Sequence, residues 1–278
     1  MPGFIDLHMH TTMSDGALTP PEVLEKVRAA SLAAFALADH DTIEGYWHLT
    51  KLLRPEDPEL VTGLELSVAV NGFDMHMLAY LFDPDNAELN EMLVSFQEGR
   101  NLRGSRMVQK LNEQGLALPF EAVLNAANGS AIGRPHIADA LVHKGLVASV
   151  EDAFRRHIGD HCPAYIPKSV IIPEEAISMI HRAGGLAVLA HPFINDMHKQ
   201  IPSLVKQGLD GIEVYHYSHN KQQIQELKRL AVRYKLVKTG GSDFHGRQKH
   251  EGEIGAYQIP LEFLENMKDR TLEIRGRN

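Results

Sequence analysis

Short apolar runs alternate with longer amphipathic stretches along most of the chain. Apolar runs of about four to eight residues are typical of buried strands, whereas apolar residues at every third or fourth position indicate helices. This alternation predicts repeated β-α units and a mainly parallel sheet. The predicted strands are Phe4–Leu7, Ala34–Ala38, Leu60–Leu64, Met75–Leu81, Ala187–Ala190, Gly211–Tyr215 and Leu236–Thr239.

Helices are predicted between these strands. Thr19 is a suitable N-cap and Pro20 suits the first helical turn, so one helix is expected from about Pro20 to Ala30. Further helical patterns cover Pro173–Ala183, Leu204–Gln207 and Lys221–Tyr234. The interleaving of strands and helices predicts an α/β fold of barrel or near-barrel type.

The pattern changes between about Glu88 and Pro163. Helical patterns follow one another there with no convincing strand between them, over Leu89–Gln114, Phe120–Ala127, Pro135–Lys144 and Val150–His157. This predicts a helical insert, residues 88–163, within a barrel formed by residues 1–87 and 164–278. Neither edge of the insert is rich in proline, serine and glycine, so the insert is expected to pack against the barrel.

Composition and charge exclude several classes of protein. The 278 residues carry a net charge of −8 without a polybasic block, which excludes a protein that coats long nucleic acid by neutralising its phosphates. The longest apolar runs, such as Leu32–Ala38, are far shorter than the roughly 20 residues of a membrane span. Because no basic segment leads into an apolar one at the N-terminus, we expect a cytoplasmic protein with no membrane partner.

Histidine is the unusual component, with 16 residues concentrated in a few short segments. The single cysteine, Cys162, excludes a thiolate-rich zinc site, so any metal must be held by nitrogen and oxygen. His8 and His10 are two positions apart and follow an apolar run. Side chains two positions apart in an extended segment share one face, so both imidazoles can reach one ion. Asp15 follows in a predicted loop. By itself this pair fits a structural role equally well.

Residues of metal-ligating types stand at the ends of several other predicted strands. His40 and Glu65 each follow an apolar run, and Asp243 and His245 repeat the alternate spacing of the first pair. His76, inside an apolar strand, would by itself be interpreted as a core histidine. Because the strands of an α/β barrel end at one mouth, nine candidates are expected to meet there: His8, His10, Asp15, His40, Glu65, His76, His191, Asp243 and His245.

Asp39 and Asp41 flank His40 and have more than one possible role. They could be metal ligands, hydrogen-bonding partners of the ligands, or a helix N-cap. The supporting roles are favoured, because one imidazole at the strand end already serves as the ligand.

Six imidazoles and three carboxylates exceed what one ion needs and suit two or three ions. In the absence of sulfur ligands, Mn²⁺, Fe²⁺ and Zn²⁺ all fit this donor set. Such ions would give the mouth a positive charge and attract a small anion. A hydroxide bridging two ions would be a nucleophile at neutral pH, and a third ion could hold the oxygens of a phosphate ester.

Four segments together resemble a known family. They are Asp6-Leu-His8-Met-His10-Thr-Thr-Met-Ser-Asp15-Gly16, Ala38-Asp39-His40-Asp41-Thr42, Ala190-His191-Pro192 and Gly241-Ser242-Asp243-Phe244-His245. In these motifs the sequence resembles the PHP (polymerase and histidinol phosphatase) family over nearly the whole chain outside the insert. The resemblance implies a distorted (β/α)7 barrel with a trinuclear centre, most simply of three Mn²⁺ ions.

The resemblance also implies how the ligands divide among the ions. His8, His10, Glu65 and Asp243 would hold one ion, Glu65, His76 and His191 a second, and Asp15, His40 and His245 the third. His191, Asp243 and His245 would lie nearest the metal-bridged hydroxide. No expected ligand position is missing from the sequence.

The predicted insert contains Gly133-Arg134-Pro135-His136-Ile137-Ala138 and in this resembles a bacterial branch of the family that acts on nucleotides. Pro135 suits a first helical turn, which places Arg134 beside backbone N–H groups able to bind phosphate. A surface ion pair is the alternative role for Arg134. The resemblance implies a phosphatase that removes the 3′-phosphate of nucleoside 3′,5′-bisphosphates and leaves a nucleoside 5′-monophosphate.

Two other functions remain open at this stage. A 5′→3′ exonuclease on short RNA would use the same metal chemistry, and a non-catalytic metal-stabilised binding module would use none. A histidinol phosphate phosphatase is disfavoured, because its substrate carries one phosphate and leaves the arginines of the insert without a ligand.

Further candidate substrate contacts are less specific. Asn101, Arg103 and Arg106 lie on one predicted helix, where the two arginines share a face that could bind phosphate or form a solvated basic surface. Lys168, His216 and His219 could line the mouth or pack elsewhere. The general acid is open between bound water, His219 and Asp41. The remaining histidines are assigned structural roles: His48, His143, His157, His181, His198 and His250.

Overall fold

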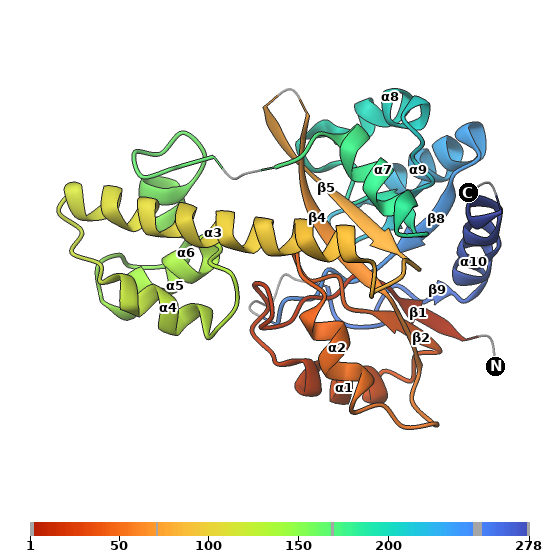
Figure 1. Cartoon of the computed structure of the whole chain (residues 1–278), viewed down its shortest axis with the longest axis horizontal. Helices are drawn as coiled ribbons and strands as arrows, with labels where there is room; N and C mark the ends of the chain where they lie inside the picture. The colour runs from red at the N-terminus through yellow and green to blue at the C-terminus, as the bar shows by residue number, and fades with distance from the viewer. Residues whose placement is uncertain (1–2, 71, 168–169, 247–251, 277–278) are drawn as a thin grey trace.

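The computed structural model describes residues 3–70, 72–167, 170–246 and 252–276. Within these residues the chain has a mixed α/β fold in which the strands form two sheets. Figure 1 shows the long helix α3 running from the sheets to a separate group of helices, α4 to α6. The two termini lie at the opposite end of the molecule from that group.

The first sheet has the strand order β3-β2-β1-β9. β1 (Phe4–Asp6), β2 (Ala34–Ala36) and β3 (Glu59–Val61) are parallel, and β9 (Ile259–Pro260) is antiparallel to β1. β1 and β2 exist as predicted but end one or two residues earlier, so His8 and His40 lie beyond the last residues of their strands.

The second sheet has the order β4-β5-β6-β7-β8. Its strands are β4 (Gly63–Val70), β5 (Phe73–Tyr80), β6 (Leu186–Leu189), β7 (Gly211–Tyr215) and β8 (Val237–Gly240). β5 is antiparallel to both neighbours, which corrects the expected parallel arrangement at this point. The single strand predicted over Leu60–Leu64 is wrong: the segment is divided between β3 and the start of β4, which lie in different sheets. β4 continues to Val70, because the polar Glu65 and Ser67 alternate with apolar residues and interrupt the apolar run.

The two sheets meet through a few backbone pairings. Met9, beyond β1, pairs with Phe244, beyond β8, and His40, beyond β2, pairs with Glu65 of β4. These pairings bring the ends of four strands to one side of the molecule. The described residues form two sheets and not one continuous closed barrel, so the predicted distorted (β/α)7 barrel is confirmed only as an α/β fold.

Helices cover the sheets. They are α1 (Pro20–Ala29), α2 (Glu44–Thr50), α7 (Pro173–Arg182), the 3₁₀ helix η2 (Ile194–Gln200), α8 (Ile201–Lys206), α9 (Lys221–Tyr234) and α10 (Glu262–Arg275). α1 begins where the sequence predicts, with the Thr19 N–H donating to Glu22 at 2.8 Å. α2 and α10 lie outside the predicted helices. α2 is short and contains Gly45, so its sequence gives little indication of a helix. In α10, by contrast, apolar residues such as Leu264 and Met267 have helical spacing, and this pattern could have predicted the helix.

The region predicted to be helical contains α3 (Ala87–Glu113), α4 (Phe120–Ala127), α5 (Arg134–His143) and α6 (Val150–Ala153). A π-helical turn, η1 (Phe154–Ile158), follows α6 where the sequence predicts one continuous helix. These helices bury an apolar cluster of their own that includes Leu118 and Leu141. The division of the chain into a barrel and an insert with boundaries at residues 88 and 163 stays a prediction.

The helix α3 connects two apolar clusters. It is continuous over 27 residues from Ala87, and it is capped by Asn86, whose side chain accepts a hydrogen bond from the Leu89 N–H. Leu93 near its start packs into the main core, and Met107 near its end packs among the other helices. Neither α3 nor any other helix in the described part of the chain is both long and apolar enough to cross a membrane.

Candidate metal centre and adjoining pocket

The first group of candidate ligands forms where the chain leaves β1 and β8. His8 Nε2 and His10 Nε2 lie 3.2 Å apart, as the alternation of side chains in an extended segment predicts. Asp243 Oδ1 lies 3.3 Å from His8 Nε2 and 3.1 Å from His10 Nε2. All three side chains are buried.

The second group surrounds Glu65, in β4. The Oε2 atom of this carboxylate lies 3.2 Å from His40 Nδ1, and the Oε1 atom lies 2.9 Å from His76 Nδ1. His191 Nε2 is 3.0 Å from the same Oε1. Glu65 therefore lies between histidines from several elements. The positions of His40 and His191 at strand ends predict that they reach this carboxylate. His76 reaches it from inside β5, because β5 pairs antiparallel with β4.

The third group lies around Asp15. His245 Nε2 is 3.4 Å from Asp15 Oδ1, His10 Nδ1 is 3.8 Å from Asp15 Oδ1, and His40 Nε2 is 3.9 Å from Asp15 Oδ2. One ligand atom per residue lies within 4.8 Å of the others in three sets: His8, His10 and Asp243; His40, Glu65 and His76; and His10, Asp15, His40 and His245. The structure thus brings together all nine side chains that the strand ends predict.

The donor atoms fit divalent cations. They are imidazole nitrogens and carboxylate oxygens, the types that bind Mn²⁺, Fe²⁺ and Zn²⁺. The Nδ1 atoms of His10 and His40 are buried and have no hydrogen-bond partner among the described residues, although each lies within 4.0 Å of a carboxylate oxygen. Buried polar atoms are almost always paired, and a cation bound between these nitrogens and carboxylates would pair them.

The carboxylates of the centre are held in their ionised form. Burial by itself raises the pKa of Asp15, Glu65 and Asp243, but the surrounding imidazoles outweigh burial and hold each pKa well below its usual range. For Asp15 the largest opposing effect comes from His245. The three carboxylates therefore remain anionic and are available to bind a cation.

The imidazoles divide according to their surroundings. Burial lowers the pKa of His10, but hydrogen bonds to Asp243 and Glu65 outweigh it and raise that pKa to about 10. Burial dominates at His40 and lowers its pKa to about 3, which leaves a neutral ring with a lone pair for a metal. Asp243 and Glu65 thus favour a positive charge beside them. A proton on His10 provides this charge, and a bound metal ion would provide it in the same place.

Hydrogen bonds orient the segments on both sides of His40. Asp39 accepts hydrogen bonds from the Thr11 N–H at 2.7 Å and the Ser14 hydroxyl at 2.6 Å. Asp41 accepts hydrogen bonds from the Ser67 N–H at 2.7 Å and its hydroxyl at 2.8 Å. The structure therefore gives both aspartates the supporting role that the sequence favours.

Two further side chains support the ligands: Glu213, which is not a candidate in the sequence, and His216, which the sequence offers only as a possible lining residue of the mouth. His8 Nδ1 lies 2.8 Å from Glu213 Oε1, and the His191 N–H donates to Glu213 Oε2 at 2.7 Å. His216 Nε2 lies 3.0 Å from Asp243 Oδ2. Glu213 is the middle residue of β7, and a charged residue inside an otherwise apolar strand is the signal that could have identified it.

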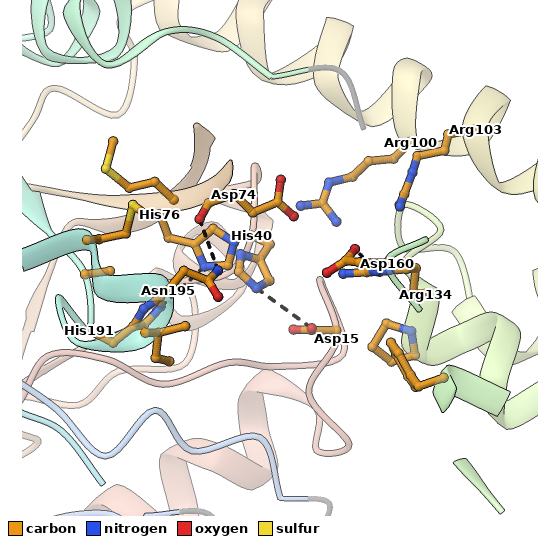
Figure 2. A pocket seen from close by; sticks show the side chains of 17 residues that line it. Asp15, His40, Asp74, His76, Arg100, Arg103, Arg134, Asp160, His191 and Asn195 are labelled. Carbon is orange, nitrogen blue, oxygen red and sulfur yellow. Dashed lines mark hydrogen bonds and ion pairs between the residues drawn. The ribbon is translucent and has the colours of Figure 1, made fainter. Parts of the chain in front are cut away.

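A cavity of about 300 Å³ adjoins the candidate metal centre. Asp15, His40, His76 and His191 line one side, and Arg100, Arg103 and Arg134 line the other (Figure 2). Arg100 and Arg103 come from α3, and Arg134 is the first residue of α5. Asp74, Asp160 and Asn195 also line this space. We call it the anion pocket, because cationic side chains and potential metal ligands line it together.

The arginines differ in how they are held. Arg100 Nε donates to Asp41 Oδ2 at 2.7 Å. Burial lowers the pKa of this guanidinium, but the Asp41 carboxylate outweighs burial and raises the pKa. Arg103 Nε donates to the Ile166 carbonyl at 2.6 Å. Burial and the neighbouring arginines lower the pKa of Arg103 to about 10. Arg100 was not a candidate in the sequence, although its spacing of three residues from Arg103 places both on one helix face.

None of the remaining candidate substrate contacts that the structure describes lines the anion pocket. Asn101 Oδ1 accepts a hydrogen bond from the Ile132 N–H at 3.0 Å, and Arg106 is exposed; neither lines the anion pocket. His219 is buried, with Nδ1 3.1 Å from the Val214 carbonyl. Lys168 and His250 lie outside the described residues. A substrate-binding role for Asn101 or His219 stays a prediction.

Comparison with known proteins agrees with these features. Residues 6–165 match the model of the PHP domain family. A 5′-3′ exoribonuclease from Haemophilus influenzae is 33% identical over 245 residues, which cover 86% of this chain and 89% of that protein. A 3′,5′-nucleoside bisphosphate phosphatase from Chromobacterium violaceum is 33% identical over 257 residues, covering 90% of both chains.

The fold has an equally clear counterpart among solved structures. A protein from Bifidobacterium adolescentis, described as a candidate metal-dependent phosphoesterase, superposes with a TM-score of 0.88. The two chains are 33% identical, and the match covers 97% of this chain and 98% of the other. With the ligand motifs, the grouping of their side chains and these matches in agreement, the chain belongs to the PHP family of phosphoesterases.

Proposed function

We propose that this protein is a metal-dependent phosphatase that removes the 3′-phosphate of nucleoside 3′,5′-bisphosphates and leaves nucleoside 5′-monophosphates. The observation that carries the proposal is the anion pocket, in which candidate metal ligands and three arginines line opposite sides of one cavity. A substrate with a phosphate at each end of a ribose can place one phosphate on each side.

Three divalent ions, most simply Mn²⁺, would be held by the candidate ligands. His8, His10, Glu65 and Asp243 would hold one ion, Glu65, His76 and His191 a second, and Asp15, His40 and His245 the third. The distances of Asp243 to His8, of His76 and His191 to Glu65, and of His245 to Asp15 support this division. His40 lies 3.9 Å from Asp15 and 3.2 Å from Glu65, so it borders two of the three sets. When bound, such ions supply Lewis acidity and generate a nucleophile from water at neutral pH.

The residues of the chain would hold this arrangement in place. Glu213 bonds to His8 and to the backbone of His191, so one buried carboxylate fixes the orientation of ligands from two elements. Outer partners of this kind usually set the orientation of a ligating imidazole and the lone pair that it presents. Among the ligands, His191, Asp243 and His245 would lie nearest the reacting phosphorus.

The arginine side would bind the phosphate that is not hydrolysed. A guanidinium presents a planar set of donors that matches phosphate oxygens, and it remains charged at neutral pH. Arg134 is the favoured contact, because it begins α5 and its side chain remains partly exposed in the pocket. Arg103 lies in the same pocket and would add positive charge beside it.

The test is phosphate release by Mn²⁺-reconstituted protein from adenosine 3′,5′-bisphosphate. AMP, 3′-AMP, histidinol phosphate and a short 5′-phosphorylated RNA are assayed beside it. The proposal expects strong preference for the bisphosphate and complete loss of turnover with a chelator. Equal rates on the bisphosphate and 3′-AMP would contradict the role of the arginine side.

A 5′→3′ exonuclease on short RNA is the second candidate. The Haemophilus influenzae relative carries that name at the same identity as the phosphatase relative. The same pocket would then hold a 5′-phosphate on the arginine side and a phosphodiester on the metal side. Faster consumption of the short RNA than of the bisphosphate would favour this function over the phosphatase.

A non-catalytic metal-stabilised module is the alternative of a different class. His191→Ala separates it from both enzymes. A catalytic centre should lose turnover while the far-ultraviolet circular dichroism is retained, whereas a purely structural centre should lose its folded spectrum and show no turnover in either form.

A further inference from the structure

Arg134 already has an anionic partner in the anion pocket. Its Nη1 donates to Asp160 Oδ1 at 2.8 Å. The same guanidinium lies 5.6 Å from the centre of the Phe154 ring and 5.4 Å from that of Tyr165. Figure 2 shows the Asp160 carboxylate beside Arg134, on the side of the pocket away from His40 and His191. The aromatic rings fix the guanidinium in place, and Asp160 occupies one edge of it.

The partners of the pair differ in exposure. The Arg134 side chain is 22% exposed, whereas that of Asp160 is 61% exposed. Asp160 follows the π-helical turn η1, and within the described residues its side chain has Arg134 as its one ionic partner. An exposed carboxylate loses little free energy on returning to water, so a ligand anion can displace it easily.

The other arginines of the pocket are bound differently. Arg100 is paired with Asp41, which is 1% exposed and also accepts hydrogen bonds from Ser67. Arg103 donates to a backbone carbonyl. A ligand cannot easily displace either of these partners. Among the described residues of the pocket, the carboxylate that a ligand anion can displace from an arginine is therefore Asp160, on Arg134.

We propose that Asp160 competes with the nucleotide phosphate for Arg134 and so weakens retention of the nucleoside 5′-monophosphate product. This inference rests on the proposed function, in which Arg134 binds the phosphate that is not hydrolysed. The substrate has contacts on both sides of the pocket, but the product has lost its 3′-phosphate and is held mainly at Arg134. Asp160 takes the place of the departing phosphate and is a positioning residue that acts through Arg134.

The effect is modest, because exposed ion pairs are weak. Asp160→Asn keeps the size of the side chain and removes its charge, so AMP should bind to this variant about two- to fivefold more tightly than to the wild type. Asp160→Glu keeps the charge and should bind AMP as the wild type does.

A matched control is available outside the pocket. Glu88 pairs with Arg182 at 2.7 Å, and both side chains are about half exposed. Glu88→Gln therefore removes the same charge from a similar exposed ion pair that lies away from the anion pocket. AMP affinity should be unchanged in this variant.

The experiment is calorimetric titration of AMP into the Mn²⁺-loaded full-length protein. It compares the wild type with Asp160→Asn, Asp160→Glu, Glu88→Gln, Arg134→Ala and the double variant of Asp160→Asn with Arg134→Ala. Tighter binding by Asp160→Asn that disappears when Arg134 is absent supports the inference. The inhibition constant of AMP in the phosphatase assay should fall by the same factor.

The outcomes separate this inference from the proposed function. If Asp160→Asn binds AMP no more tightly than the wild type while Arg134→Ala still weakens binding, competition by Asp160 is overturned and Arg134 remains the phosphate anchor. If Arg134→Ala leaves AMP affinity unchanged and the wild type does not hydrolyse the bisphosphate, both the inference and the proposed function are overturned.

Discussion

The two sides of the anion pocket are built on different principles. On the metal side, side chains from several strand ends contact one another, and the Glu65 carboxylate alone lies within 3.3 Å of the imidazoles of five histidines. On the arginine side, each guanidinium projects from a helix, and its partners differ from one arginine to the next.

This difference separates chemistry from selectivity. Side chains in a mutually contacting, buried cluster cannot change without disturbing their neighbours. The hydrogen-bond partners of Arg103 and Arg134 lie outside the metal side, so a substitution of either arginine should alter which substrate binds and leave the metal chemistry in place. The contrast can be tested by comparing variants on the two sides.

The largest effect is expected on the metal side, from Glu65→Gln. This change removes a charge shared by two of the candidate groups, so metal content and activity should fall together. Phosphate release should drop at least about a hundredfold, since even residues that only support metal ligands account for about 10–100-fold. Metal analysis and the phosphate assay measure both quantities. Glu91→Gln, which removes the charge of an exposed residue on α3, is the control. If Glu65→Gln protein kept normal manganese content and turnover, the assignment of Glu65 as a metal ligand would be refuted.

The next effect concerns Arg100, which connects α3 to the metal side through Asp41. Arg100→Met leaves the buried Asp41 carboxylate without its guanidinium, and breaking a buried pair costs about 3–5 kcal/mol. The free energy of unfolding, measured in urea, should fall by about 3 kcal/mol. The exposed Arg106→Met on the same helix should change it by less than about 0.5 kcal/mol. Equal losses in the free energy of unfolding of the two variants would show that the buried Arg100–Asp41 ion pair does not stabilise the fold.

Arg134→Ala should have a smaller effect that depends on the substrate. Loss of charge-assisted hydrogen bonds worth about 1.5–3 kcal/mol lowers kcat/KM for the bisphosphate by about ten- to a hundredfold. For 3′-AMP, which has no 5′-phosphate, kcat/KM should stay within about twofold of the wild type. A parallel loss on both substrates would place Arg134 on the reacting phosphate.

The smallest effect is expected at Asn101, one residue beyond Arg100. Asn101→Ala removes the acceptor of the buried Ile132 N–H, which should lower the free energy of unfolding by about 1 kcal/mol. KM for the bisphosphate should stay within about twofold, because this side chain lies outside the anion pocket. A larger rise in KM would support the predicted role of Asn101 as a substrate contact.

The metal side could be predicted from sequence because local spacing carries the information. The alternation of His8 and His10 and the polar ends of apolar runs fix which side chains share a face, and parallel strands bring those ends together. His76 is the exception. It reaches the centre from inside β5, which is antiparallel to its neighbours, and that pairing depends on contacts distant in sequence.

The arginine side was only partly predictable. The Gly133-Arg134-Pro135 segment indicated a helix start, and α5 does begin at Arg134. Arg100 gave no comparable signal, because α3 carries many charged residues and the sequence does not say which of them face the sheets. The same limit applies to the closure of the predicted barrel, which depends on how strand edges distant in sequence meet; the described residues form two sheets joined by isolated pairings.

The continuity of α3 has a mechanical consequence. Its 27 residues extend over about 40 Å, and its two ends are packed into different apolar clusters. Arg100 and Arg103 lie between these anchored ends, so neither cluster can rotate against the other without bending the helix or moving both guanidinium groups. The positions of Arg100 and Arg103 relative to the metal side are therefore set by one continuous helix and not by loops.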